Sequence, residues 1–190
     1  PYREMKPEVE GLLEGISEGA LRIQNIVDNL KEFSQFDKGS KLQILNINPL
    51  IETAIAITDN LIRKSTDYFS IKLQDNMPDI KGNQQQLEQV IINLITNACQ
   101  ALTNRTNKIT VTSSCDNNNI IVEVKDEGVG INSEDIKYVM DPFFSNKTDV
   151  GGTGLGLYIS YNIIKEHGGE LKLISKEGEG TAAIINLPVS

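Results

Sequence analysis

The sequence predicts an α+β domain preceded by a long separate helix. Three patterns indicate this: an apolar heptad repeat near the N terminus, two later segments with helical apolar spacing, and short alternating segments typical of strands. The 190 residues are 39% hydrophobic, which suffices for one well-packed domain and an accessory element. We therefore expect a helix over residues 1–40 and a compact domain over 41–190.

Composition narrows the range of functions. The net charge of −8 argues against a large nucleic-acid or anionic-membrane surface. Cys99 and Cys115 lack metal-ligand or CxxC spacing, which favours a reduced cytoplasmic setting. No apolar run reaches the ~20 residues of a membrane span. Because the chain opens on Pro1, we expect a piece of a longer protein and leave open a membrane anchor elsewhere.

The first helix carries a sustained heptad seam, with apolar residues at Val9, Leu13, Ile16, Ala20, Ile23, Val27 and Leu30. A helix of about 28 residues is about 42 Å long, too long and too one-sided for this domain alone to bury. We therefore expect other helices to cover it, most simply in a homodimer. The alternative is a helix folded back on its own domain.

The domain begins with a strand over residues 42–47, after which Asn48 and Pro49 predict the start of a helix that runs to about Lys64. A strand over 69–73 and an edge segment over 78–81 follow. Gly82 and Asn83 then predict the start of the next helix, over residues 84–102.

That helix combines an apolar face with a polar stripe. Asn93 and Asn97 lie one turn apart, so their side-chain amides project to the same place. Asparagine is unfavourable within helices, and two at this spacing indicate a chemical role. The alternative is solvated surface.

Strands over 108–113 and 120–125 predict a hairpin that ends at Asp126, with Gly128 and Gly130 beyond it. A carboxylate at a strand end, beside glycines that let a flat ring approach, suits recognition of an exocyclic amine. Taken alone, these three residues are better explained by an ordinary strand-to-loop turn.

A short helix capped by Asn132 or Ser133 is expected to reach about Met140. The irregular segment after it carries Phe143 and Phe144, which need a place to pack, and Lys147, which could reach a phosphate. The two aromatic residues could instead form a hydrophobic plug.

A mobile loop then leads into a helix expected over residues 153–167. Its glycines, Gly154 and Gly156, cost about 1 kcal/mol each inside a helix, which makes sense if backbone N–H groups approach phosphate oxygens there. A hairpin over 170–175 and 181–187 completes the domain.

Four motifs in this order resemble the ATP-binding catalytic domain of sensor histidine kinases. They are Asn93 with Asn97, Asp126 with Gly128 and Gly130, Asp141-Pro142-Phe143-Phe144, and the GGTGLGL run that begins at Gly151. The resemblance covers residues 42–188. It implies a two-layer α/β sandwich, a mixed sheet with helices on one face, shared with the gyrase and Hsp90 ATPases. The N-terminal helix is similar to the second helix of the family's dimerisation and phosphoacceptor hairpin.

The resemblance also implies residue roles for ATP and Mg²⁺. Asn97 would give an oxygen to Mg²⁺, and Asn93 would support the phosphates or the waters bound to the metal. Asp126 would accept from the adenine amine, and Lys147 would neutralise phosphate charge. The remaining nucleotide-binding residues would be Gly128, Gly130, Phe144, Gly152, Thr153, Gly154, Leu155 and Gly156. The implied partners are a second copy in the intact kinase and a response-regulator receiver domain, with no nucleic acid.

Two departures from the family pattern qualify this interpretation. The phosphoacceptor histidine of the family lies on a helix that has no counterpart here, and the single histidine, His167, ends a helix after the glycine loop. The basic residue that many members carry one turn after the asparagines is also replaced, by Cys99-Gln100-Ala101. The sequence thus predicts the catalytic half of a histidine kinase. An ATP-hydrolysing clamp of the same fold and a non-catalytic dimeric scaffold remain the alternatives.

Overall fold

In the computed structural model of the chain, the structure describes residues 9, 15–16, 19–20, 24, 42–144 and 153–190. The residues described before position 25 are helical. The rest of the heptad helix and the domain boundary at 40/41 lie outside the described residues, so both stay predictions.

The domain is built on a five-stranded mixed sheet with the order β2-β4-β5-β7-β6. Its strands are β2 (Tyr68–Leu73), β4 (Lys108–Asp116), β5 (Asn119–Asp126), β6 (Glu170–Lys176) and β7 (Gly180–Pro188). Only the β2–β4 pair is parallel among these neighbours. A separate antiparallel pair joins β1 (Gln43–Leu45) to β3 (Ile80–Gly82).

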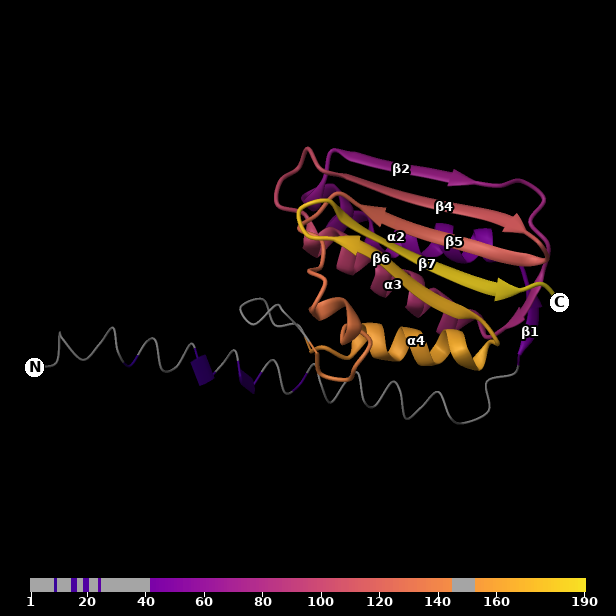
Figure 1. Cartoon of the computed structure of the whole chain (residues 1–190). Coiled ribbons are helices and arrows are strands. Elements are labelled where there is room, and N and C mark those ends of the chain that lie inside the picture. Colours follow the sequence, from indigo (N-terminus) through magenta and orange to yellow (C-terminus); the bar gives the residue numbers. More distant parts are fainter. Residues whose placement is uncertain (1–8, 10–14, 17–18, 21–23, 25–41, 145–152) are drawn as a thin grey trace, which may run out of the picture.

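Three helices lie on one side of this sheet (Figure 1). They are α2 (Ile47–Ser65), α3 (Gln84–Ala101) and α4 (Gly156–Glu166). Helix α3 lies between the other two and contacts both, and it also packs on β5 and β7. The predicted two-layer sandwich is confirmed. Within the described residues, no helix is both long and apolar enough to span a bilayer.

The core lies between α3 and the central strands. Ile91 and Ile95 of α3 are at most 1% exposed, as are Val111 of β4 and Val122 of β5. These positions alternate along the strands and recur one turn apart on α3, so that each element buries one face. Each buried aliphatic side chain of this size contributes about 1.5–3 kcal/mol. The opposite, polar side of α3 is thereby held in a fixed orientation.

Helix α2, the first helix of the domain, begins earlier than predicted. Asn46, expected in the strand, is the N-cap of α2, and its side chain accepts from the N–H of Asn48 at 3.0 Å. Asn48 instead donates its amide to the carbonyl of Gln74 at 2.9 Å. Asn46 and Asn48 could each cap the helix, but the side chain of Asn48 is engaged by its long-range hydrogen bond to Gln74. The predicted cap of α3, Asn83, is confirmed, with its side chain accepting from the N–H of Gln86.

Two other predicted helices are shorter in the structure. The segment expected over 132–140 contains only a 3-10 turn, η1 (Asp135–Lys137), because Asn132 caps a single turn by accepting from the N–H groups of Glu134 and Asp135. The helix expected from Thr153 begins at Gly156. Gly154 has φ +67°, a left-handed conformation that no right-handed helix accommodates.

Candidate functional site

Asn93 of α3 lies where α3 meets the start of α4. The amide nitrogen of Asn93 donates to the hydroxyl of Ser160 at 2.9 Å. A Cβ placed on Gly156 would stand 2.4 Å from the Asn93 side-chain oxygen. Gly156 and Ser160 are one turn apart on α4, so that one side of this helix rests on Asn93. The absence of a side chain at Gly156 is thus what allows Asn93 to occupy this position.

Asn97 is one turn further along α3 and is half-buried. Within the described part of the chain, its side-chain amide makes no hydrogen bond. A half-buried amide costs free energy unless it finds a partner, and water or a ligand can supply one. Its neutral oxygen is a suitable donor to a hard cation such as Mg²⁺. Asn97 therefore has the properties expected of a ligand-binding residue.

Asp126 ends β5 as a buried carboxylate, 4% exposed. Its Oδ1 accepts from the N–H of Gly128 at 2.8 Å and from the N–H of Thr181 at 3.3 Å. These two hydrogen bonds fix the orientation of the carboxylate. The residue thus provides an oriented acceptor at the end of the central strand, next to α3.

The negative charge of Asp126 affects the pKa of Cys99 on the neighbouring helix α3. Burial raises the pKa of the Cys99 thiol above its ordinary value of 9.0. A hydrogen bond with Ser65 lowers this pKa, and the negative charge of Asp126 raises it further. The thiol is therefore neutral near pH 7, and the polar groups at this end of α3 are the carboxylate and the amides.

The loop after β5 is pressed against the C-terminal end of α3. The N–H of Val129 donates to the Ala101 carbonyl at 3.0 Å, and a Cβ on Gly128 would lie 2.5 Å from that same oxygen. Gly130 has φ +67°, and a Cβ there would stand 2.0 Å from the Lys176 carbonyl. Both glycines are required by the close approach of backbone segments. The alternative of a turn with structural glycines is therefore partly right.

The aromatic motif is tied to the glycine loop. The N–H of Phe143 donates to the Gly154 carbonyl at 3.0 Å, and a Cβ on Gly154 would lie 2.4 Å from the Phe143 carbonyl carbon. Phe143 has φ +67°, a conformation that costs a bulky residue about 1–3 kcal/mol. The Phe144 ring lies 6.3 Å from that of Tyr138, while Phe143 is 62% exposed. Only Phe144 packs on another ring.

The described residues of the glycine loop, 153–155, include one buried side chain. Leu155 is 3% exposed, and its N–H points to the Thr153 hydroxyl at 3.4 Å. Lys147 and Gly152 lie outside the described residues, so their roles stay predictions. Along α3, Asn93 meets Gly156 at the start of α4, and Ala101 at the C-terminal end meets the loop that carries Gly128. Asp126 is close enough to Cys99 of the same helix to affect its pKa, and Gly154 is tied to Phe143.

Sequence reasoning missed two partners in this site. Thr181 reaches Asp126 only through the pairing of β5 with β7, which no local pattern predicts. Ser160, which is 2% exposed, accepts from Asn93. Its spacing of four residues from Gly156 was the one available signal, because both lie on the same side of α4.

His167 has a structural position. It is the C-cap of α4 and is 9% exposed. Its Nε2 accepts from the backbone N–H of Asn83 at 2.9 Å, and its Nδ1 donates to the Ile163 carbonyl at 2.7 Å. Both ring nitrogens are engaged, so a phosphoryl group on either would break a buried hydrogen bond. His167 is therefore poorly placed to accept a phosphoryl group.

Comparisons with known proteins agree with this arrangement. A family model described as "Histidine kinase-, DNA gyrase B-, and HSP90-like ATPase" matches residues 82–190. Over 183 residues the chain is 30% identical to the sensor histidine kinase ZraS of Escherichia coli (strain K12), covering 96% of this chain and 38% of ZraS. The chain therefore spans less than half the length of this curated relative.

Solved structures give the same result. The catalytic domain of histidine kinase ThkA superposes with a TM-score of 0.69 and 31% identity, covering 78% of this chain and 96% of that one. The crystal structure of ThkA in complex with the response regulator protein TrrA matches with a TM-score of 0.72 and 26% identity, covering 90% of this chain and 49% of that one.

A mixed sheet with helices on one face, an amide pair on the middle helix and a buried carboxylate beside it define an ATP-binding domain. The chain belongs to the histidine kinase-, DNA gyrase B- and HSP90-like ATPases, and within them it is a histidine-kinase catalytic domain.

Proposed function

We propose that this chain is the catalytic region of a sensor histidine kinase. It transfers the γ-phosphate of ATP to a histidine on an upstream helix, for onward transfer to a response-regulator aspartate. The observation that carries the proposal is the available amide of Asn97, located between the oriented carboxylate of Asp126 and the glycine-containing start of α4.

In this proposal the purine lies beside Asp126. One carboxylate oxygen is held by backbone N–H groups, so the carboxylate keeps a fixed direction from which to accept a hydrogen bond from the adenine amine. Gly128 and Gly130 shape the loop that borders the base. Phe144 contributes an apolar contact at the opposite side of the site.

The phosphates lie between α3 and the glycine loop. Asn97 gives its side-chain oxygen to Mg²⁺, and a half-buried neutral amide fits that ion because the triphosphate supplies the negative charge. When bound, Mg²⁺ neutralises charge on the phosphate oxygens. The backbone N–H groups of Thr153, Gly154, Leu155 and Gly156 donate to the phosphates, together with Gly152. Lys147 adds a positive charge.

Catalysis rests mainly on positioning. Asn93 is held by Ser160, so its amide has a fixed orientation beside the phosphates when an imidazole attacks the γ-phosphorus in line. As the N–P bond forms, the bond between the γ-phosphorus and the β–γ bridging oxygen breaks, and ADP leaves with that oxygen while the imidazole nitrogen carries the phosphoryl group. The acceptor histidine belongs to a helix outside this chain.

The partners follow from the same proposal. The ThkA structure includes a response regulator, which supports a receiver domain as the partner of the intact kinase here. The heptad pattern of residues 1–40 supports homodimerisation through the helical hairpin. We place this region in the cytoplasm, as part of a sensor that can be membrane-anchored elsewhere.

An ATP-hydrolysing clamp is less well supported. It needs a carboxylate base to activate water, and Asn93 cannot accept that proton. Glu88, the nearest acidic residue before it on α3, is half-buried and accepts from Gln84 at 2.8 Å. This carboxylate is therefore already engaged by a side chain one turn earlier on the same helix.

Radiolabelled ATP tests the proposed function. We expect the chain to bind Mg-ATP without labelling itself, and to phosphorylate an added acceptor hairpin from a related kinase. Label on the chain alone would contradict the proposal. Rapid phosphate release without transfer would favour the clamp, and failure to bind Mg-ATP at millimolar concentration would favour a scaffold.

A further inference from the structure

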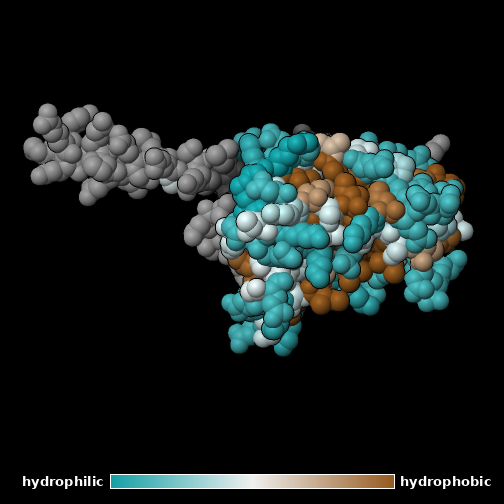
Figure 2. Space-filling model, turned by 90° about the horizontal axis from the view of Figure 1, so that it is seen from above, coloured by the Kyte–Doolittle hydropathy of each residue, from teal (hydrophilic) through white to brown (hydrophobic). Residues whose placement is uncertain are grey.

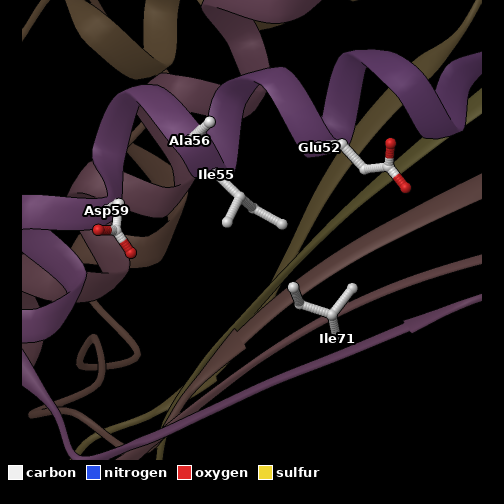
Figure 3. Close-up of a pocket in the computed structure, with 5 residues that line it drawn as sticks. All are labelled: Glu52, Ile55, Ala56, Asp59 and Ile71. Carbon is white, nitrogen blue, oxygen red and sulfur yellow. The ribbon is translucent and has the colours of Figure 1, made fainter.

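An open groove of about 410 Å³ lies between α2 and β2, on elements that carry none of the candidate ATP-binding residues. Glu52, Ile55, Ala56 and Asp59 of α2 form one wall, and Ile71 of β2 forms the other. The side chains of Ile55 and Ile71 point toward one another across the gap (Figure 3). We call this the α2–β2 groove.

The groove lies between one face of α2 and the edge strand β2. The four wall residues of α2 recur at the spacing of one helix face, while Ile51, Ala54 and Ile62 on another face are buried in the core. Strand β2 is the outermost strand of the sheet, and no strand of the described chain pairs with its outer edge. The groove therefore lies beside an unpaired edge of the sheet, to which one further strand could add.

The two edges of the sheet differ in chemistry. Strand β6 at one edge reads ELKLISK, with charges at Glu170, Lys172 and Lys176, and charged edges discourage strand addition. Strand β2 reads YFSIKL, with Lys72 as its single charge. Ile71 is 47% exposed, and hydrophobic residues gather among polar ones on this side of the molecule (Figure 2). The β2 edge is thus the one open to a partner strand.

The ends of the groove are acidic. Glu52 is exposed and has no hydrogen bond or ion pair within the described residues. Asp59 pairs with Arg63 at 2.7 Å, but the two side chains are 50% and 77% exposed. Exposed ion pairs of this kind are weak and can exchange partners. Together the two carboxylates attract a positively charged ligand.

We propose that the α2–β2 groove binds an extended, basic segment of a partner protein. The segment adds to β2 as a further strand, placing an apolar side chain between Ile55 and Ile71 and lysine or arginine near Glu52 and Asp59. Main-chain hydrogen bonds to the β2 edge provide affinity, and the groove selects alternate side chains. The interaction leaves the nucleotide site free.

A fluorescent peptide, acetyl-Thr-Lys-Thr-Ile-Thr-Lys-Thr-amide, tests this proposal by polarisation with the full chain. As a strand, it presents both lysines and the isoleucine on one face. We expect saturable binding. A peptide with glutamate in place of lysine, and one N-methylated at the amides facing β2, are each expected to bind at least about tenfold more weakly.

Variants of the protein locate the site. Glu52→Lys with Asp59→Lys is expected to weaken peptide binding by at least about tenfold. Glu170→Lys, a similar charge reversal on the opposite edge, is expected to leave it unchanged. Thermal unfolding confirms that each variant is folded. Three results would overturn the proposal: no saturable binding, equal binding of the N-methylated peptide, or preference for a basic helical peptide over the extended one.

Discussion

Single side chains in this protein have a defined orientation where the nucleotide is proposed to bind. Asp126 illustrates this, because backbone N–H groups from its own loop and from β7 hold the same oxygen. Asn97 shows the complementary case, a side chain that the described residues leave available for a ligand. Asp126 thus provides a hydrogen-bond acceptor with a fixed direction, and Asn97 provides an oxygen atom that is available to a metal ion.

Asp126→Asn should weaken nucleotide binding about 10- to 100-fold, because a hydrogen bond to a charged acceptor is worth about 1.5–3 kcal/mol. Isothermal titration with Mg-ATP measures the change. Asp116→Asn at the exposed β4–β5 hairpin is the matched control and should bind as the parent does. Equal affinity in the two variants would show that Asp126 does not contact the base.

Cys99 gives a pH-dependent prediction. Since burial raises its pKa, the folded state favours the neutral thiol. This contribution to the free energy of unfolding is fully present below the pKa of the thiol in the unfolded state, near 9. It is lost as pH rises through the higher pKa of the folded state. Urea unfolding from about pH 8 to about pH 10 should show a shallower decline for Cys99→Ala than for the parent. Parallel declines would contradict this.

The residue types of the site were predictable from the sequence, because Asn93 and Asn97 share a helix face and Asp126 ends an alternating strand. Their hydrogen-bond partners were not. Ser160 and Thr181 approach through tertiary packing and strand pairing across more than fifty residues. The close approaches of Gly128 and Gly130 to carbonyl groups are likewise invisible in a linear pattern.

The helices set the geometry of the site at the next scale. Helix α3 buries one face in the core and holds the asparagines on another, while α4 begins at Gly156 against Asn93 and ends at His167 against Asn83. Two contacts therefore fix α4 along α3. A substitution at either end of α4 is expected to alter how the glycine loop before it contacts the phosphates.

Gly156→Ala tests the α3–α4 contact. The added methyl would stand 2.4 Å from the Asn93 oxygen, and rotation of that flexible amide relieves the clash while breaking its bond to Ser160. We expect phosphotransfer to a separate acceptor hairpin to fall by about tenfold, with little change in thermal stability. Gly19→Ala is the control, because a Cβ there meets nothing within 4 Å. Unchanged transfer would show that the orientation of Asn93 is unimportant.

Periodicity predicted most elements, since α2, α3 and the antiparallel strands bury regular faces. Periodicity failed to predict helix ends, because neighbouring residues can serve as alternative caps. Asn46 and Asn48 compete for one cap, and tertiary bonds at Asn48 decide the outcome. The start of α4 is set by the left-handed Gly154. The parallel pairing of β2 with β4 joins segments forty residues apart and needs the whole fold.

At the scale of the whole molecule, nucleotide binding and the proposed partner contact involve different elements. The sheet and α3 hold the candidate ATP site, whereas α2 and β2 form a groove at one edge. The two sites therefore lie on separate elements. Occupation of the groove should leave nucleotide affinity unchanged, and a titration of Mg-ATP with and without saturating basic peptide measures this. A shift of about tenfold or more would show that the two sites are coupled.

The most direct measurement is calorimetric titration of Asn97→Ala with Mg-ATP and with ATP in excess chelator. Because no described residue bonds the Asn97 amide, this variant should keep the stability of the parent. The parent should bind Mg-ATP more tightly than metal-free ATP, and the variant should lose most of that difference. Asn60→Ala on the exposed side of α2 should behave as the parent. If Asn97→Ala retained the full magnesium dependence, the proposed site would be wrong.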